Sequence, residues 1–238
     1  MKNTEPFEYF GSDLEALSSA HNYNNWIYSG FSGYVGNVSA EVGAGIGNFS
    51  ELVLQSNTLK RLFLLEPSQN MFKLLEKRFK DNCRVITKNT YLSDQEECLK
   101  GSLDSILFIN VLEHIEDDHV ALKEAENALK SNGNLIIFVP ACPFLYSRFD
   151  KLVGHHRRYT RKSLSTAART AGFEIKSLKY VDMLGIIPWF LFFVLLRKIP
   201  SGTNISIYDK IAVPLISKIE KIVPPIIGKN LLLIAQKV

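Results

Sequence analysis

Alternating glycines follow a short apolar run, a pattern typical of a ligand-binding turn. Gly43, Gly45 and Gly47 come directly after Val42, and Glu41 stands just before them. Glycine lacks Cβ and adopts positive φ without strain, so the backbone of such a turn can approach a bound molecule closely. A helix that starts beyond the turn would add free N–H groups. The spacing differs from the G-x-G-x-x-G of dinucleotide sites. This difference disfavours NAD and favours another nucleoside-containing ligand.

A second set of reactive side chains lies in residues 154–159, which read Gly-His-His-Arg-Arg-Tyr. His155 or His156 could take a proton from a hydroxyl group, because the pKa of free imidazole lies near neutrality. Arg157 or Arg158 could hold a phosphate or carboxylate through paired hydrogen bonds. We therefore predict that this segment, the acceptor loop, contacts the substrate.

The acceptor loop has a plainer alternative as an ion-paired surface segment. Asp150 would then pair with an arginine, and Thr160 would cap the next helix. Glu113 and His114 are further candidate bases, since they follow a predicted strand end. A histidine in that place can equally be structural, so both interpretations stay open.

Strands and helices alternate along the chain, and these elements must position the reactive groups. Apolar runs predict buried strands, and apolar residues at helical spacing predict helices between them. The expected strands are 38–42, 62–65, 85–86, 106–109, 135–139, 173–180 and 231–236, and the expected helices lie at 12–20, 49–53, 68–79, 117–129 and 160–171. Asn132-Gly133 should end the helix at 117–129. This alternation predicts an α/β fold, with a Rossmann-like, mostly parallel sheet and helices on both faces.

In an open parallel sheet, ligands bind beyond the carboxyl ends of the strands. Glu66 closes the second predicted strand, about 20 residues beyond the glycines, where a carboxylate can accept hydrogen bonds from both ribose hydroxyls. Asn89 and Asn110 also fall just past strand ends. Glu41, Glu66 and the two asparagines should therefore converge on one nucleoside site.

Together these segments resemble the motifs of class I S-adenosylmethionine-dependent methyltransferases, over roughly residues 23–180. The motifs are Glu-Val-Gly-Ala-Gly-Ile-Gly at 41–47, Leu-Glu-Pro-Ser at 65–68, Thr-Lys-Asn-Thr at 87–90, Asn-Val-Leu-Glu-His at 110–114 and Leu-Lys-Ser-Asn-Gly-Asn at 129–134. The resemblance implies S-adenosylmethionine as cofactor, S-adenosylhomocysteine as product, and a seven-stranded sheet whose last strand runs antiparallel. The implied cofactor-binding residues are Glu41, Gly43, Ala44, Gly45, Gly47, Glu66, Pro67, Asn89, Thr90, Asn110 and Val111.

A narrower resemblance concerns the acceptor. Residues 22–26, which read Asn-Tyr-Asn-Asn-Trp, the acceptor loop and an apolar C-terminal segment are similar to type 11/12-like, ubiquinone-biosynthesis O-methyltransferases of bacteria. This implies a small or lipid-linked acceptor, methylated on oxygen, while nitrogen and carbon acceptors stay open. The predicted catalytic residues are His155, His156 and His114, the predicted substrate contacts are Tyr23, Trp26, Tyr146, Arg157, Arg158 and Tyr159, and no metal ligands are expected.

Two other functions are compatible with parts of the sequence. An NAD(P)-dependent oxidoreductase would use the same sheet, but its G-x-G-x-x-G signature is missing. A non-catalytic nucleoside-binding module that docks on a membrane enzyme would keep the glycine turn, because binding motifs do not prove turnover.

Length and composition favour one domain and restrict its partners. The 238 residues suit a single domain, with a helical cap at 1–35, a cofactor-binding core at 36–180, an apolar helical insertion at 181–229 and a last strand at 230–238. A net charge of +4 with scattered basic residues does not favour nucleic-acid binding. The three cysteines form no disulfide or zinc pattern, and the polar N-terminus lacks a signal peptide, so we expect a cytoplasmic protein.

The apolar insertion allows two interpretations. Residues 183–196 are apolar on all sides but shorter than the ~20 residues that span a bilayer. Lysines then alternate with aliphatic residues over 210–222, a pattern that favours an amphipathic helix. We expect either a lid on the core or a peripheral membrane contact through residues 183–222.

Overall fold

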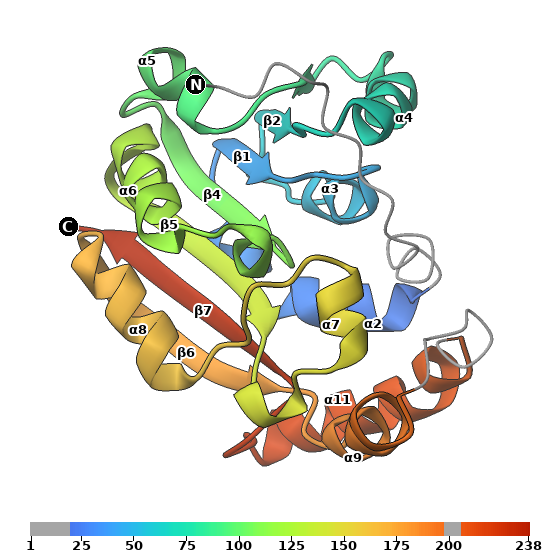
Figure 1. Ribbon diagram of the computed structural model, residues 1–238. Helices are drawn as coiled ribbons and strands as arrows, with labels where there is room; N and C mark the ends of the chain where they lie inside the picture. Colours follow the sequence, from blue (N-terminus) through green and yellow to red (C-terminus); the bar gives the residue numbers. More distant parts are fainter. Residues whose placement is uncertain (1–19, 198–205) are drawn as a thin grey trace.

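The computed structural model describes residues 20–197 and 206–238, which form a sheet with helices on both faces (Figure 1). The strands are β1 Val38–Val42, β2 Arg61–Leu65, β3 Val85–Lys88, β4 Leu103–Ile109, β5 Leu129–Pro140, β6 Phe173–Val181 and β7 Asn230–Lys237. Their order is β3-β2-β1-β4-β5-β7-β6, and β7 runs antiparallel to both of its neighbours while the other pairs are parallel. This seven-stranded, mostly parallel sheet confirms the predicted fold class.

Helices connect the strands and continue after β6. They are α2 His21–Ser29, α3 Asn48–Val53, α4 Gln69–Phe79, α5 Glu96–Leu99, α6 Asp118–Ala128, α7 Arg148–Leu152, α8 Arg161–Thr170, α9 Ile186–Trp189 and α11 Val213–Ile222. Shorter or wider helical turns are η1 Ser32–Tyr34, η2 Ser93–Gln95, η3 Leu112–His114, η4 Pro143–Leu145, η5 Phe190–Leu195 and η6 Tyr208–Ala212. Residues 12–19 of the first predicted helix lie outside the described residues.

Apolar residues alternate between the two faces of the sheet, and helices cover both faces. In β4, Ile106 and Phe108 join one buried cluster, while Leu107 and Ile109 join the other. Residues of α6 and α8 complete the first cluster, and residues of α2, α3 and α4 complete the second. Because both faces are covered, the central strands appear in the sequence as nearly continuous apolar runs.

One predicted helix end is wrong. α6 starts where expected but ends at Ala128, before Asn132-Gly133. The reason is that Leu129 already pairs with Leu103 of β4, so tertiary pairing takes the chain out of the helix. Gly133 serves the strand instead, since a Cβ there would stand 2.9 Å from the carbonyl oxygen of Lys130.

Between β6 and β7, the described residues contain α9, η5, η6 and α11, which gather beside α7 and α2 and which we call the helical insertion (Figure 1). None of the helices in the described part of the chain has the length and hydropathy needed to cross a bilayer.

Candidate active site

The glycine turn connects β1 to α3 at the carboxyl ends of the parallel strands (Figure 1). Gly43, Gly45 and Gly47 have φ angles of +66°, +57° and +86°, a region that strains residues with side chains. The N–H of Gly43 donates to the carbonyl oxygen of Leu65 at 2.8 Å, and the N–H of Ala44 donates to the same oxygen at 3.1 Å. The turn is therefore fastened to the end of β2.

Packing also requires two of these glycines. A Cβ at Gly43 would lie 2.7 Å from a methyl group of Val111, in the turn after β4. A Cβ at Gly47 would collide with the ring of Phe79 in α4. Gly43 thus lets the turns after β1 and β4 touch, whereas Gly47 lets α4 pack against the glycine turn.

Glu66, directly after β2, is held by backbone N–H groups. Its Oε2 accepts a hydrogen bond from Gly45 and its Oε1 accepts one from Ser68, both at 2.8 Å. Burial raises the pKa of Glu66, and the two hydrogen bonds partly oppose this rise. Each oxygen keeps a further lone pair, so the fixed carboxylate can accept hydrogen bonds from a diol. This geometry fits the ribose of S-adenosylmethionine.

Glu41 is buried beneath the glycine turn. Its Oε2 accepts a hydrogen bond from the hydroxyl of Ser50 in α3 at 2.6 Å. Burial raises the pKa of Glu41 to about 7, although the bond from Ser50 lowers it. Glu41 therefore connects β1 to α3 and supports the glycine turn from below, inside the protein.

Asn89, after β3, presents only an acceptor to a ligand. Its amide nitrogen donates to the carbonyl oxygens of Glu66 at 2.8 Å and Pro67 at 3.1 Å. Both N–H groups are thus used, and the amide oxygen is left to accept a hydrogen bond, as from an adenine amino group. The hydroxyl of the neighbouring Thr90 donates to the carbonyl oxygen of Tyr91 at 3.2 Å.

Asn110 turns the chain at the end of β4. It has a φ of +54°, which asparagine tolerates better than most residues, and its N–H donates to the carbonyl oxygen of Phe138 at 2.8 Å. Val111 then lies against Gly43. We call the glycine turn, Glu66, Asn89 and Asn110 the cofactor edge.

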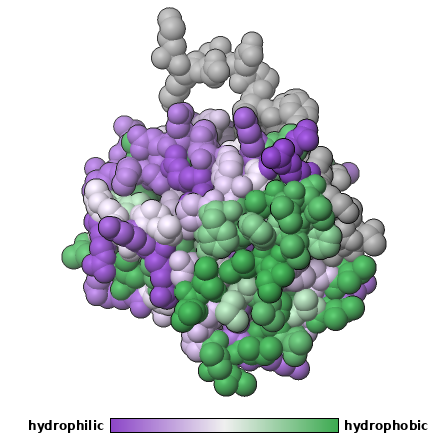
Figure 2. Space-filling model, turned by 60° about the horizontal axis from the view of Figure 1, so that its bottom comes forward, coloured by the Kyte–Doolittle hydropathy of each residue, from purple (hydrophilic) through white to green (hydrophobic). Residues whose placement is uncertain are grey.

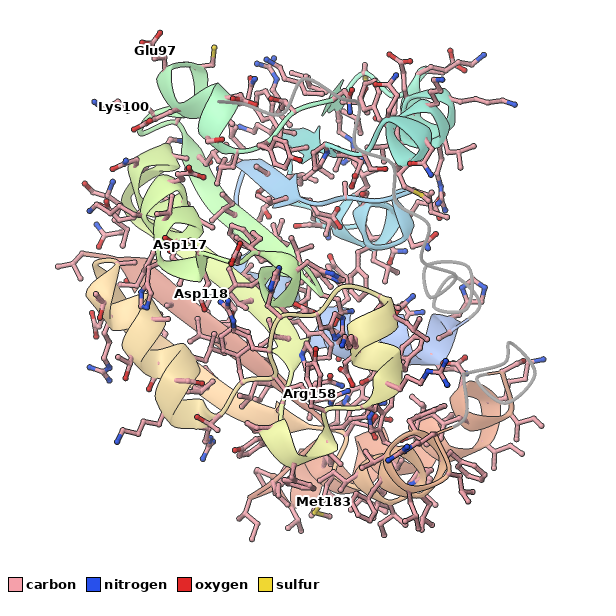
Figure 3. All side chains as sticks on the ribbon, in the orientation of Figure 1. Glu97, Lys100, Asp117, Asp118, Arg158 and Met183 are labelled. Atoms are coloured by element: carbon pink, nitrogen blue, oxygen red, sulfur yellow. The ribbon has the colours of Figure 1, made fainter. Side chains whose placement is uncertain are left out.

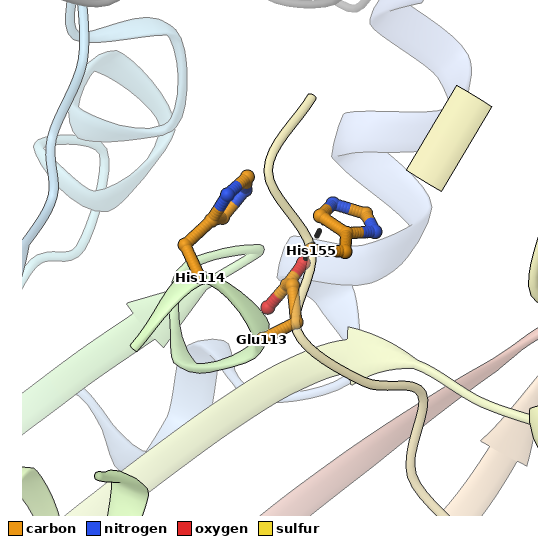
Figure 4. Close-up of side chains that lie close together, drawn as sticks. All are labelled: Glu113, His114 and His155. Carbon is orange, nitrogen blue, oxygen red and sulfur yellow. Dashed lines mark ion pairs between the residues drawn. The ribbon is translucent and has the colours of Figure 1, made fainter. Parts of the chain in front are cut away.

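Side chains from η3 and the acceptor loop meet beside the cofactor edge (Figure 4). Glu113 is fully buried, and neither of its carboxylate oxygens has a hydrogen-bond partner among the described residues. Nε2 of His155 lies 3.8 Å from Oε1 of Glu113, and the rings of His114 and His155 stand edge to face with centroids 4.6 Å apart. Two of the three predicted catalytic histidines are therefore brought together.

Asp150 orients His155. Nδ1 of His155 lies 2.9 Å from Oδ1 of Asp150, which also accepts a hydrogen bond from Nε of Arg158 at 2.8 Å. Burial alone would raise the pKa of Asp150, but the bonds from His155 and Arg158 outweigh burial and lower it. An ionised Asp150 favours a proton on Nδ1 of His155, and Nε2 faces Glu113.

Burial sets the protonation of the two neighbours of His155. It raises the pKa of Glu113 to about 7 and lowers the pKa of His114 to about 4, with His155 adding to the second effect. His114 is consequently neutral at physiological pH and cannot serve as a charged acid there.

Glu113, His114 and His155 also have the chemistry of metal ligands. One carboxylate oxygen and one nitrogen of each imidazole lie within 4.8 Å of one another. Such ligands suit zinc and related divalent cations, and the Asp150 contact is of the kind that supports a metal-bound histidine. The sequence pattern did not predict this arrangement.

Both arginines of the acceptor loop form ion pairs with carboxylates of the protein, and Arg158 and Asp118 are labelled in Figure 3. Arg158 is buried, pairs with Asp150, and donates to the carbonyl oxygen of Ala141 at 3.2 Å. Arg157 pairs with Asp118 at 3.0 Å. The plainer alternative for the loop gives the pairing of Asp150 with an arginine correctly, but Arg158 is buried and not at the surface. Arg157 keeps 30% of its side chain exposed.

The remaining predicted side chains divide between core and surface. Tyr159 is buried and donates to Oδ2 of Asp118 at 2.7 Å. Tyr23 is buried as well, with its ring edge-on to Trp26 at 5.9 Å. Tyr146 donates its hydroxyl proton to the carbonyl oxygen of His155 at 2.6 Å, which steadies the acceptor loop.

His156 is exposed, and only its backbone reaches the cluster, donating from its N–H to the carbonyl oxygen of Glu113 at 2.9 Å. Of the two adjacent histidines, His155 is therefore the one beside Glu113 and Asp150.

An open hollow of about 870 Å³ lies beside the acceptor loop, at the N-terminal ends of α6 and α8. Asp117, Asp118, His119, Arg157 and Thr160 are among its lining residues. The hydroxyl of Thr160 caps α8 by accepting a hydrogen bond from the N–H of Ser163 at 3.0 Å. The hollow leaves room for a molecule next to Arg157, between polar and apolar side chains.

Sequence reasoning missed the orienting role of Asp150 and gave Asp118 no place in the site. A local signal for Asp150 exists, because Ser147 and Asp150 form a capping box at the start of α7. No local pattern connects Asp118 with Tyr159, since their contact is made across the fold.

Comparison with known proteins indicates the class of reaction. Residues 40–135 match a family described as a methyltransferase domain. The chain has no significant match among curated protein sequences.

Solved structures share the fold. Phospholethanolamine N-methyltransferase 2 of Haemonchus contortus, in complex with phosphomonomethylethanolamine and S-adenosylhomocysteine, has a TM-score of 0.63 and 15% identity over 95% of this chain and 57% of its own. A SAM-dependent methyltransferase of Archaeoglobus fulgidus has a TM-score of 0.59 and 16% identity, over 92% of this chain and 94% of that one.

An S-adenosylmethionine-dependent methyltransferase of Mesorhizobium loti has a TM-score of 0.57 and 15% identity, over 86% of this chain and 93% of that one. Such low identities show the fold alone, whereas the domain match covers the strands that carry the glycine turn and Glu66. The match to a methyltransferase domain and the shared fold support the resemblance to class I S-adenosylmethionine-dependent methyltransferases, with S-adenosylmethionine as the cofactor.

Proposed function

We propose that this methyltransferase transfers the methyl group to a hydroxyl oxygen of an acceptor with a lipid-like apolar part. The observation that carries the proposal is the Asp150–His155 pair, in which Nδ1 of His155 lies 2.9 Å from the buried carboxylate. A hydroxyl acceptor needs a base more than an amine does, and an oriented imidazole is the commonest biological base.

The residues of the cofactor edge would hold the methyl donor. Glu66 would accept hydrogen bonds from the ribose hydroxyls, and the amide oxygen of Asn89 would accept one from the adenine amino group. The glycine turn and Asn110 would surround the amino-acid portion. When bound, the cofactor supplies a methyl group on a positively charged sulfur.

His155 would then remove the proton of the acceptor. As the acceptor oxygen forms its bond to the methyl carbon and the sulfur–methyl bond breaks, the hydroxyl proton passes to Nε2 of His155. Asp150 would stabilise the resulting imidazolium through the proton on Nδ1. Burial around Glu113 and His155 limits water, which favours transfer to the acceptor over side reactions.

The choice among the sequence-based alternatives follows from these findings. The methyltransferase-domain match favours an enzyme over a non-catalytic nucleoside-binding module and over an NAD(P)-dependent oxidoreductase. The resemblance to ubiquinone-biosynthesis enzymes stays a prediction, and with it the identity of the acceptor. Nitrogen and carbon acceptors are outcomes that the following experiment would reveal.

The test is methyl transfer from labelled cofactor to bacterial lipid extracts, quinol precursors and sugar nucleotides, with the labelled product analysed by mass spectrometry. We expect an O-methyl ether. The matched variants are His155→Gln and His156→Gln, which change adjacent imidazoles of which only the first lies beside Asp150. His155→Gln should lower kcat by about 100-fold or more, and His156→Gln should change it only a few-fold.

Cofactor affinity, measured by calorimetry, should be the same in both variants, because neither histidine belongs to the cofactor edge. Label on nitrogen or carbon would overturn the assignment to oxygen. Equal kcat values for the two variants would remove His155 as the base. A parallel assay with a chelator, followed by added zinc or magnesium, determines whether the Glu113 cluster acts with a bound cation.

A further inference from the structure

The helices near the C-terminus expose large apolar side chains on one side of the molecule, seen as a broad green area in Figure 2. The most exposed of them, each at least 60% accessible, are Ile187, Leu195, Ile211, Leu215, Ile222, Val223 and Ile226. We call these residues the apolar face. Single exposed aliphatic residues are common on proteins, but a contiguous apolar patch marks an interaction site.

α11 shows that the apolar face is more than an incompletely covered core. Val213 and Ile216 point into the protein and are 1% and 3% exposed. Leu215, Ile219 and Ile222 recur at helical spacing on the outer side and are 60%, 40% and 83% exposed. A helix that only packs on its own fold needs one apolar side, whereas α11 has two.

The exposed charges around the apolar face are all positive within the described part of residues 183–227. Arg197, Lys210, Lys218 and Lys221 are exposed there. The apolar face is therefore accompanied by cations and by no exposed carboxylate in that described part.

The acidic residues of the same region are turned inwards. Asp209 is buried and accepts a hydrogen bond from the N–H of Tyr23 at 2.8 Å. Glu220 is half-buried and accepts hydrogen bonds from the N–H groups of Asp182 at 3.2 Å and Met183 at 2.8 Å. These contacts keep negative charge away from the outer surface. An anionic partner would require such a surface.

The insertion that carries the apolar face also contacts the acceptor side of the active site. Trp189, in α9, donates from its indole nitrogen to the carbonyl oxygen of Leu145 at 3.1 Å. The guanidinium of Arg158 lies over the Trp189 ring, 4.7 Å from its centre, and the same guanidinium binds Asp150. A continuous chain of contacts therefore connects the insertion with the residue that orients His155.

We infer that the apolar face lies in the interface of a bilayer that contains anionic lipids, and that the acceptor is reached from this bilayer. Aliphatic side chains would enter the boundary between headgroups and acyl chains, and the lysines would contact lipid phosphates. A second copy of the chain would place like charges opposite one another, which disfavours a self-associated face. The inference rests on the proposed lipid-linked acceptor and names the surface that presents it.

The test is sedimentation of the full chain with vesicles of phosphatidylcholine, with or without 30% phosphatidylglycerol. The variants are Ile222→Glu with Ile226→Glu on the apolar face, and Leu74→Glu on α4 as a matched control, since Leu74 is 55% exposed away from the insertion. We expect binding to anionic vesicles at least tenfold stronger than to neutral ones. The double variant should lose at least tenfold, and Leu74→Glu should bind like the unaltered chain.

Charge is tested separately by Lys218→Glu with Lys221→Glu, compared with Lys77→Glu on α4. The first pair should remove the preference for anionic vesicles, and the control should keep it. Calorimetry with S-adenosylmethionine should give the same affinity for every variant, which shows that the fold is intact.

Failure of the unaltered chain to sediment, or equal losses in the face and control variants, would overturn the inference. A dimer in analytical ultracentrifugation that Ile222→Glu dissociates would likewise overturn it and assign the face to a second copy. His155→Gln should bind vesicles normally, so failure of the proposed catalysis and failure of the membrane contact are separable.

Discussion

The cofactor edge and the acceptor side of this methyltransferase are built by different kinds of interaction. At the cofactor edge, backbone groups hold the functional side chain, as when Gly45 and Ser68 donate to Glu66. At the acceptor side, side chains hold one another, and Asp150 joins His155 to Arg158. The first arrangement depends on a local turn, whereas the second depends on burial.

This difference matches the two tasks of the regions. The cofactor edge binds one invariant nucleoside, so a fixed backbone turn with one hydrogen-bonded carboxylate is sufficient there. An acceptor site must hold a proton-transfer group, and Glu113 remains buried there with two oxygens that have no described hydrogen-bond partner. The cofactor edge is therefore expected to respond to changes in backbone, and the acceptor side to changes in charge.

The largest expected effect tests the backbone half of this comparison. Gly45→Leu should weaken S-adenosylmethionine binding by more than about 100-fold, because φ at Gly45 is +57° and the N–H of Gly45 holds Glu66. Gly101→Leu is the matched control, since Gly101 has a φ of +58° with open space around its Cβ position. Calorimetry gives the affinities, and circular dichroism checks the fold.

Gly101→Leu carries the same backbone strain away from the site, so its affinity should stay within a few-fold of the unaltered chain. Equal affinity of Gly45→Leu and the unaltered chain would move the cofactor away from the glycine turn. Equal losses in the two variants would assign the effect to general strain.

A smaller but still large effect tests the acceptor side. Asp150→Asn should lower kcat by about 100-fold, because an amide can hold the wrong tautomer of His155 and cannot stabilise an imidazolium. Asp118→Asn is the control, since Asp118 also pairs with an arginine and lies in the hollow, but is bonded to Tyr159 and Arg157. Rates at saturating cofactor, with affinity measured separately, isolate the catalytic step.

Both substitutions remove a carboxylate paired with an arginine, so both should lower stability. Only Asp150→Asn should alter catalysis strongly. Similar decreases in kcat would mean that the Asp–Arg pairs act through folding, and the distinction between the two regions would lose its basis on the acceptor side.

How far the sequence predicts each region follows from these interactions. The turn at Gly43 and the strand-end position of Glu66 are local features, so spacing alone indicated them. Arg158 was predicted as a substrate contact because an arginine can hold a phosphate or carboxylate, yet it is 6% exposed in the fold. The end of α6 was missed for a similar reason, since pairing of Leu129 with Leu103 across the sheet overrode a local glycine signal.

The smallest expected effect concerns stability and sharpens the description of the cofactor edge. In the folded chain, burial raises the pKa of Glu41 to about 7, while in the unfolded chain the pKa of a glutamate lies near 4.3. Between these values the folded state binds more protons, so the unaltered chain loses stability as pH rises from about 4 to about 7. Glu41→Gln stays neutral and can still accept the hydrogen bond from Ser50.

Above pH 7 the variant should therefore be more stable than the unaltered chain by up to about 3 kcal/mol. Below about pH 4 the ionisation of Glu41 should make no difference to stability. Thermal unfolding from pH 4 to pH 8 would show a difference in Tm that grows to several degrees. Glu76→Gln, at an exposed position of α4, should show no such growth. A difference that is constant with pH, or a variant less stable at pH 8, would mean that Glu41 is an ionised and compensated group. The glycine turn would then rest on buried charge, as the acceptor side does, and the contrast between the two regions would not hold.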